Sequence, residues 1–457
     1  MKKRTAPAPS APRPSPGEVC NVALLGFGTV GSSVAKILCE RTDLGLRVTH
    51  ILNRNVERKR VSWLPESVQW TEKIDEVLAS DARIVVEVMG GLQPTEDWIE
   101  RVLSSGKSVV TANKQLIARR GKALMALARK NKQQLLYGAS VAGGVPVISG
   151  LQAGLAGDTL FKIRGILNGT CNYILSRMEN ERLPFAEALR EAQNLGFAES
   201  DPTEDIDGLD ARAKLAILAR VGLRCDVPAE SIAAQSISRI EAIDFEYANQ
   251  LGCTIRQISW AELKPATKAN SKKTRAARPT QTVQQPPAEV SLFASVGPAL
   301  VELSSPLARV EGSQNLLVAT GTYGGETVFG GHGAGGHPTA VAVVSDILAI
   351  ARSSQTDGGG PDQSVVHQGA VSNDSTSKHY LRFYVKDQPG IIATLATILS
   401  GYGVNIDAVL QEPGHPKRKL PFLITLQECE ASLVEEALGQ INALDFLVQP
   451  CLHLPIF

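Results

Sequence analysis

The chain has 457 residues, a net charge of +1 and 43% hydrophobic residues, which fits an ordinary globular protein of about three domains. It has no basic stripe interleaved with aromatic residues and no apolar run long enough to cross a bilayer, so neither nucleic acid nor a membrane is an expected partner. Its seven cysteines are scattered and never form a CxxC pair, which indicates reduced thiols in a cytoplasm rather than a disulfide framework or a zinc site.

Residues 1–18 are basic at first and then rich in proline, alanine and serine. We predict a disordered tail there, because such a sequence buries too little apolar surface to offset the entropy of ordering. The tail lacks the apolar segment of a secretory signal. Residues 19–146 then alternate short apolar runs with helical segments, as in "NVALLGF" followed by "SSVAKILCER". This alternation predicts an α/β domain of the Rossmann type, with a parallel sheet and crossover helices.

A glycine-rich turn, "GFGTVG", stands between the first predicted strand and the first predicted helix. In that context GxGxxG favours a dinucleotide site, because the glycines let a pyrophosphate approach the positive end of the helix. A glycine turn in some other α/β domain is the alternative. The predicted cofactor contacts in this turn are Gly26, Phe27, Gly28, Thr29, Val30 and Gly31.

The end of the second strand indicates which nucleotide is preferred. NAD sites usually carry an acid about 20 residues after the glycine turn, where it accepts from the ribose hydroxyl. This chain instead has Asn53 and Arg54 there, and an arginine can pair with a 2′-phosphate. The sequence therefore favours NADP, with NAD as a second cofactor. After the third long strand, Gly90 and Gly91 are expected beside the nicotinamide ribose.

Residues 147–329 mix helical and strand-like text and are predicted to form an α+β catalytic and dimerisation domain. Helices are expected at 168–196, 207–222 and 228–235, and strands at "FKIRGIL" and "NLLVATGTY". Within this region, 263–289 is polar, basic and proline-bearing, so we predict an exposed, mobile insertion. A contact with an anionic partner is the less favoured reading of its charge.

The remaining chain begins with a glycine cluster at 330–336. A helix is expected to follow it, and we assign residues 330–352 to the Rossmann domain. Residues 353–377 are rich in serine, glycine, aspartate and glutamine and are predicted to be a linker. Residues 378–457 then follow the order strand–helix–strand–strand–helix–strand, which is typical of a ferredoxin-like unit.

The stretch "GLDARAKLAILAR" is an amphipathic helix with an unusual polar flank. Asp207, Asp210 and Lys214 recur at helical spacing, and "FAESDPTEDID" just before them is rich in acids. Taken alone, the spacing of Asp210 and Lys214 would favour a surface ion pair worth only about 0.3–0.5 kcal/mol. The accompanying motifs favour a chemical role.

Five motifs occur together in one order: "VVTANK" (109–114), "GASVAGGVPVI" (138–148), "GILNGTCNYIL" (165–175), "GFAESDPTEDIDGLDARAKLAILA" (196–219) and "GGHGAGGHPTA" (330–340). This combination resembles homoserine dehydrogenase over residues 20–352. The segment "VKDQPGIIATLATILSGYGVNIDAV" resembles an ACT domain. The resemblance implies interconversion of L-homoserine and L-aspartate 4-semialdehyde with NAD(P), in the biosynthetic branch to threonine, methionine and isoleucine.

The resemblance also implies roles for individual residues. Glu199 matches the glutamate that binds homoserine, and Lys214 matches the acid–base lysine. Asp205 and Asp210 match acids near the reacting oxygen, and Lys114 matches a second lysine between nicotinamide and substrate. Either lysine could donate the proton; we favour Lys214 and assign a positioning role to Lys114. Because a lysine in water titrates near ~10.4, alkaline pH should favour alcohol oxidation.

Further contacts follow from the same motifs. The substrate is expected to meet Gly169 and Thr170, and the cofactor is expected to meet Gly333 and Gly335. His332 and His337 lack a third ligand and make a poor zinc site.

The family often has a glutamate where this chain has Gly138, and that glutamate contributes to a sodium site. Backbone carbonyls of Val141, Gly143 and Val145 could still hold Na+ or K+, but the anionic ligand is missing and water is the alternative. Phe197 also replaces a tyrosine that some members carry, which removes one hydroxyl.

The ACT-like segment implies an amino acid effector, for which we expect L-threonine as a feedback inhibitor. Asp387, Gly390 and Asn405 are the expected contacts, at a junction between two ACT units. A homodimer or homotetramer follows from that junction; a dimerising module without a ligand is the alternative. The rival functions are another NADP-linked dehydrogenase and a catalytically silent protein that binds nucleotide and amino acid.

Overall fold

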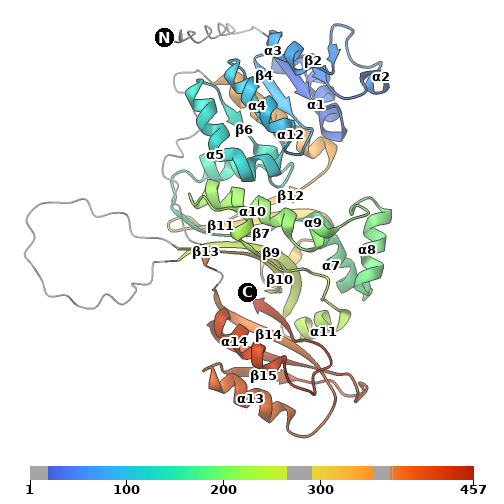
Figure 1. The fold of residues 1–457 in the computed structure, drawn as a ribbon, viewed down its shortest axis with the longest axis vertical. Helices are drawn as coiled ribbons and strands as arrows, with labels where there is room; N and C mark the ends of the chain where they lie inside the picture. The colour runs from blue at the N-terminus through green and yellow to red at the C-terminus, as the bar shows by residue number, and fades with distance from the viewer. Residues whose placement is uncertain (1–18, 265–290, 354–370, 373) are drawn as a thin grey trace, which may run out of the picture.

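The computed structural model describes residues 19–264, 291–353, 371–372 and 374–457. The predicted tail at 1–18 lies outside the described residues, as do most of the predicted insertion and linker. Three bodies follow one another along the long axis of the molecule (Figure 1). No helix in the described part of the chain is long and apolar enough to cross a membrane.

The first body is a six-stranded parallel sheet in the order β3-β2-β1-β4-β5-β6, which is the doubly wound Rossmann order. Its strands are β1 (Cys20–Leu25), β2 (Leu46–Leu52), β3 (Gln69–Thr71), β4 (Ile84–Glu87), β5 (Ser108–Thr111) and β6 (Leu135–Leu136). The chain reverses direction across the sheet between β1 and β4, and ligands of such sheets bind outside the strand ends at that point. The predicted parallel sheet is confirmed.

Alternate residues of these strands serve two helix layers. Ala23, Val85 and Val109 pack against α3 (Ile74–Ala79), α4 (Thr95–Ser104) and α5 (Lys114–Lys130). Val22, Val86 and Val110 face the opposite layer, formed by α1 (Thr29–Glu40) and α12 (Gly336–Arg352). The short α2 (Val56–Lys59) follows β2. A helix far along the chain thus completes the nucleotide-binding body.

The second body is an antiparallel sheet in the order β12-β11-β7-β9-β10. Its strands are β7 (Leu160–Ile166), β9 (Cys253–Lys264), β10 (Ser291–Glu302), β11 (Gln314–Gly321) and β12 (Gly325–His332). The helices around it are α6 (Val147–Ser149), α7 (Gly169–Glu181), α8 (Phe185–Asn194), α9 (Thr203–Ile206), α10 (Leu209–Gly222) and α11 (Ala242–Gln250). Two residues each form β8 (Ala233–Ala234) and β13 (Val371–Ser372), which pair with β10.

Helix α10 lies between this sheet and the nucleotide-binding body, where it shares one hydrophobic cluster with α5 and with β7 and β11 (Figure 1). Five consecutive residues, 215–219, have no exposed surface. A helix enclosed in this way is a core element, so a buried polar residue on it must be satisfied within the protein.

The third body is formed by β14 (Thr376–Val385), α13 (Ile391–Gly401), β15 (Ile406–Leu410), β16 (Leu420–Glu430), α14 (Ala431–Ile441) and β17 (Leu452–Ile456). Its strand order, β17-β14-β16-β15, is that of a ferredoxin-like unit, as predicted. The strand β17 also meets β10 through the pair Leu300 and Ile456, which joins the second and third bodies into one continuous sheet.

Four sequence expectations need correction. The helix expected at 168–196 is two helices, because Arg182 adopts a left-handed conformation (φ 54°) and Pro184 begins the next helix. The helix expected at 228–235 is a single turn at Ala229–Ser231 followed by β8. The boundary expected for the insertion, residue 263, lies inside a strand, since β9 continues to Lys264. The expected linker contains β13 and the first two residues of β14.

Candidate active site

The three glycines of the turn after β1 have different surroundings. A Cβ atom on Gly26, where φ is 106°, would lie 3.0 Å from the Val88 carbonyl, and one on Gly31 would lie 2.2 Å from the Gly26 carbonyl. A Cβ on Gly28 would meet nothing within 4 Å. Gly26 and Gly31 therefore close the turn, and Gly28 leaves the start of α1 open, which is the arrangement a pyrophosphate site requires.

The end of β2 is tied to this turn. Asn53 accepts from the Phe27 N–H (3.2 Å) and donates to the Arg54 carbonyl (2.7 Å), so its amide shapes the loop. The Arg54 side chain is exposed beside it. Arg60, at the end of α2, lies 3.8 Å from Glu57. Arg54 is next to the predicted nucleotide turn, and its guanidinium group has no carboxylate partner in the described chain.

A buried carboxylate that the sequence did not reveal holds the loop after β4. Glu87 has no exposed surface and accepts from the N–H groups of Met89 (2.8 Å) and Gly90 (3.0 Å) and from the Thr111 hydroxyl (2.5 Å). Burial raises the pKa of Glu87, and these hydrogen bonds oppose that rise. The loop carries Gly90 and Gly91 with φ 76° and 72°, and their Cβ positions are open.

The glycine cluster before α12 closes over the start of α1. A Cβ on Gly336 would lie 2.8 Å from the Ser33 hydroxyl and 2.9 Å from the Thr29 methyl group. A Cβ on Gly143 would lie 2.4 Å from the Gly333 carbonyl, so the two glycine loops touch through their backbones. Gly336 therefore packs against the start of α1 at the predicted cofactor turn, whereas Gly333 packs against Gly143 and Gly335 against Pro338.

The centre of the site is an ion cluster on α10. Asp210 is 4% exposed, its Oδ2 lies 2.7 Å from Lys214 Nζ, and its Oδ1 contacts Lys114 Nζ. Lys214 Nζ also donates to the Leu167 carbonyl (2.8 Å). The first residue of α5 and two residues of α10 thus meet, as the sequence predicted for Asp210 and Lys214.

The charges in this cluster stabilise one another. Burial alone would raise the pKa of Asp210, but the ammonium groups of Lys214 and Lys114 outweigh it and hold that pKa far below its usual range. Burial lowers the pKa of Lys114, and Asp210 more than reverses this, so the net shift is upward. Asp210 is therefore an anion, and Lys114 is a fixed cation.

Asn168, at the junction of β7 and α7, joins the second acid to the cluster. Its Nδ2 donates to Asp205 Oδ1 (2.6 Å) and to Asp210 Oδ2 (2.9 Å). Burial raises the pKa of Asp205, while the Asn168 hydrogen bond lowers it. Sequence reasoning included this residue in a motif but gave it no role.

The residues predicted to hold the substrate lie around α7. A Cβ on Gly169 would lie 2.6 Å from the Ser313 carbonyl, so glycine is needed for packing there. The Thr170 hydroxyl donates to the Phe197 carbonyl (2.7 Å), which holds the loop before α9. Glu199 on that loop is exposed, and its carboxylate has no hydrogen bond or ion pair within the described chain. Phe197 packs on Tyr173, with ring centroids 4.7 Å apart.

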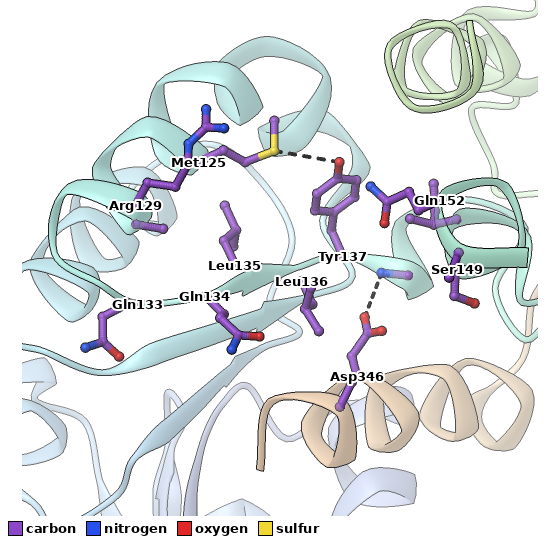
Figure 2. Close-up of a pocket in the computed structure, with 15 residues that line it drawn as sticks. Met125, Arg129, Gln133, Gln134, Leu135, Leu136, Tyr137, Ser149, Gln152 and Asp346 are labelled. Atoms are coloured by element: carbon purple, nitrogen blue, oxygen red, sulfur yellow. Dashed lines mark hydrogen bonds between the residues drawn. The ribbon is translucent and has the colours of Figure 1, made fainter. Parts of the chain in front are cut away.

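A carboxylate from a distant part of the sequence lies beside Gly138, where the family often has a glutamate. The Gly138 N–H donates to Asp346 Oδ2 (2.7 Å), and Asp346, on α12, lines a cavity of about 240 Å³. Figure 2 shows Asp346 among the other residues that line this cavity. A Cβ at 138 would lie 2.9 Å from that oxygen, so any side chain there would displace Asp346. Burial raises the pKa of Asp346 to about 6.

The three carbonyls predicted for a monovalent cation belong to the loop after Ser140. The Val145 carbonyl accepts from the Val147 N–H (2.7 Å), and Gly143 packs on Gly333. Among the described residues no three His, Cys, Asp and Glu side chains are grouped as ligands for a metal ion.

In the third body, Asp387 follows β14 and lies 3.8 Å from Lys417 Nζ. Gly390 precedes α13 with φ 92°, and a Cβ there would meet nothing within 4 Å. Asn405 follows α13 and lies 3.4 Å from Gln427 Oε1. The last two therefore lie at opposite ends of an 11-residue helix.

A doubly wound nucleotide fold beside a buried lysine–carboxylate cluster defines a nicotinamide-dependent oxidoreductase. Family models agree: "Homoserine dehydrogenase, NAD binding domain" matches residues 26–138, "Homoserine dehydrogenase" matches 146–348 and "ACT domain" matches 379–446. The chain belongs to the homoserine dehydrogenase family, and it is an oxidoreductase that acts on a CH–OH group. The resemblance seen in the sequence is confirmed.

Individual relatives cover most or nearly all of the chain. The homoserine dehydrogenase of Bacillus subtilis is 36% identical over 438 residues, which are 93% of this chain and 95% of that protein. The crystal structure of a homoserine dehydrogenase from Thiobacillus denitrificans has a TM-score of 0.85 at 29% identity and covers 96% of this chain and 98% of its own. A hyperthermophilic archaeal homoserine dehydrogenase in complex with NADPH has a TM-score of 0.58 at 27% identity, covering 72% and 97%.

Proposed function

We propose that the ion cluster around Asp210 interconverts L-homoserine and L-aspartate 4-semialdehyde, with Lys214 as the group that gives and takes the proton. The observation that carries this proposal is a carboxylate on α10, 4% exposed, that pairs with the ammonium groups of Lys214 on the same helix and of Lys114 on α5. The glycine turn at Gly28 fits a dinucleotide, because it leaves open the space that a Cβ would fill. A bound nicotinamide supplies or accepts the hydride.

In the reduction direction, Lys214 polarises the aldehyde oxygen and donates a proton to the new alcohol. Asp210 orients both ammonium groups through its two oxygens. Lys114 stays charged, because the upward shift of its pKa opposes deprotonation, and it positions the substrate. In the oxidation direction Lys214 accepts the proton from the substrate hydroxyl.

The substrate's far end requires a carboxylate and hydrogen-bond donors. Glu199 is free to bind the ammonium group, since its side chain is exposed and has no partner in the described chain. Thr170 fixes the loop that carries Glu199 through its bond to the Phe197 carbonyl, and its oxygen and the Gly169 backbone remain for the substrate.

The direct test is a coupled assay with homoserine and each nicotinamide at alkaline pH. The proposal predicts homoserine-dependent formation of reduced nucleotide. Turnover only with other alcohols would support the rival dehydrogenase, and binding of homoserine without turnover would support the catalytically silent protein.

NADP is the cofactor that the site favours, on the evidence of Arg54. Its exposed guanidinium stands beside Asn53, where an acid would repel a 2′-phosphate. The Arg54→Ala variant should lose roughly tenfold in NADPH affinity, about 1.4 kcal/mol, and little in NADH affinity. Fluorescence titration with both nucleotides measures this, and an equal loss for both would contradict the preference.

L-Threonine is the proposed effector, and the ACT domain is its proposed site. Gly390 and Asn405 are separated by α13, which is about 16 Å long, so one small amino acid cannot contact both residues of the same chain. It can contact Gly390 of one ACT domain and Asn405 of another only where two ACT domains meet. Self-association as a homodimer or homotetramer is therefore part of the proposal. Threonine should inhibit turnover and raise the melting temperature; if it changes neither, the domain only dimerises.

We also propose a cytoplasmic location. All seven cysteines are free thiols, and five of them are buried, which suits a reducing compartment.

A further inference from the structure

The side chain of Asn168 makes three hydrogen bonds inside the candidate active site, and it is 4% exposed. Its Oδ1 accepts from the Cys171 N–H (2.8 Å), which caps the start of α7. Its Nδ2 donates to Asp205 (2.6 Å) and to Asp210 (2.9 Å). The chemistry of the partners fixes the amide orientation, because a carbonyl oxygen facing two carboxylates would have no donor.

This arrangement solves an electrostatic problem. Asp205 and Asp210 share one donor nitrogen, and two carboxylates held this close, Asp210 buried and Asp205 partly buried, repel each other, which favours protonation of one of them. Two N–H groups from one amide favour the ionised form of both. If either acid were protonated, the lysines would lose part of the negative charge that holds them.

The preceding residue, Leu167, binds another member of the same cluster. The Leu167 carbonyl accepts from Lys214 Nζ (2.8 Å) and from Asn315 Nδ2 (3.2 Å). The dipeptide 167–168 therefore holds Lys214 through a backbone carbonyl and Asp210 through a side chain. Gly169 fixes its place, because a Cβ there would collide with the Ser313 carbonyl at 2.6 Å.

We propose that Asn168 is a positioning residue, which keeps Asp205 and Asp210 ionised and aligned and, through Asp210, holds Lys214 and Lys114 in place for proton transfer. The inference rests on the proposed function of this cluster. It adds a residue that touches neither substrate nor reacting atoms.

The test is the Asn168→Ser variant. Serine keeps the capping oxygen but removes both N–H donors, so the helix start is preserved and the bridge is lost. In the reduction of L-aspartate 4-semialdehyde, kcat should fall about 10- to 100-fold, and the acid limb of its pH profile should move to higher pH, because the carboxylates then protonate more easily. The NADPH affinity should stay within about twofold of the parent value.

Asn172 offers a matched control on the same helix. Its Nδ2 donates to two uncharged groups, the carbonyls of Val310 (3.0 Å) and Gly312 (2.9 Å). The Asn172→Ser variant should lower the melting temperature and leave the acid limb where it is. Asn168→Asp, which keeps the cap but adds a third carboxylate, should be slower than Asn168→Ser.

A second readout needs no turnover. On acidification below about pH 4, the free energy of unfolding of Asn168→Ser should fall less than that of the parent or of Asn172→Ser, because the pKa values of its carboxylates in the folded state then lie closer to those of the unfolded chain. Parental kcat together with an unmoved acid limb and an unmoved stability profile would overturn the inference. Absence of homoserine turnover in the parent protein would instead overturn the proposed function, while the stability profile still decides the role of Asn168.

Discussion

Asp210 shows how far a single residue's chemistry can be read from the sequence. Its spacing from Lys214 indicated an ion pair but could not show that the pair is buried, because α10 looks amphipathic and is in fact enclosed. Lys114 is 96 positions away, and only its motif suggested that it would join them. Glu87 and Asp346 gave no signal at all, since an isolated acid at a strand end or in a helix is ordinary on a protein surface.

Asp346 leads to a prediction about pH. Burial raises its folded-state pKa to about 6, above the value of about 3.9 for an aspartate in an unfolded chain. The folded state therefore binds the proton more tightly, and stability is present below about pH 4 and lost as pH rises through 6.

The Asp346→Asn variant keeps an acceptor for the Gly138 N–H and removes the titration. The free energy of unfolding of the variant minus that of the parent should increase by up to about 3 kcal/mol between pH 4 and 6 and stay level above pH 6. Urea unfolding of both proteins across this range measures the difference. A difference that does not vary with pH would contradict the buried charge.

At the scale of the element, the turn between β1 and α1 contains one glycine that folding requires and another that nucleotide binding should require. A Cβ on Gly31 would lie 2.2 Å from a backbone carbonyl, whereas one on Gly28 would enter open space. Gly31→Ala should therefore destabilise the fold by about 1–3 kcal/mol through overpacking.

Gly28→Ala should melt like the parent and bind NADPH more weakly, because its methyl group occupies the space left for the pyrophosphate. Thermal melting and nucleotide titration of the pair test this. An unchanged Kd would show that the nucleotide lies elsewhere, and a loss of stability in Gly28→Ala would show that this glycine is needed for folding.

Elements with a clear local pattern were predictable, and elements fixed by tertiary contacts were not. The doubly wound order and the ferredoxin-like unit follow from alternation along the chain. The helix expected at 228–235 fails because Ala233 and Ala234 pair with β10, a strand some sixty residues later in the sequence. The break at Arg182 has no glycine to announce it, and only Pro184 hinted at a new helix.

At the scale of the whole molecule, a buried ion cluster connects the ACT domain to the catalytic domain. Arg382 on β14 is 2% exposed and lies 2.8 Å from Glu241 and 2.7 Å from Asp244, which together form the capping box of α11. Tyr380 donates to Asp244 (2.7 Å), and Tyr384 donates to Glu241 (3.0 Å). The two domains are therefore locked by charge as well as by the β10–β17 contact.

Removing the arginine should leave two carboxylates without their partner. The Arg382→Met variant, which keeps much of the volume, should lose about 3–5 kcal/mol of stability. Chemical unfolding, with exposed Arg41→Met as the control, measures this loss. A loss below about 1 kcal/mol would mean that the cluster is hydrated and does not hold the domains together.

The central claim is that Lys214 transfers the proton. The most direct test is to measure the kcat of Lys214→Ala with homoserine, together with its NADPH affinity. The account predicts a fall in kcat of about 10²- to 10⁴-fold with NADPH binding close to the parent value. Turnover within about twofold of the parent would contradict it and would leave Lys114 as the proton donor.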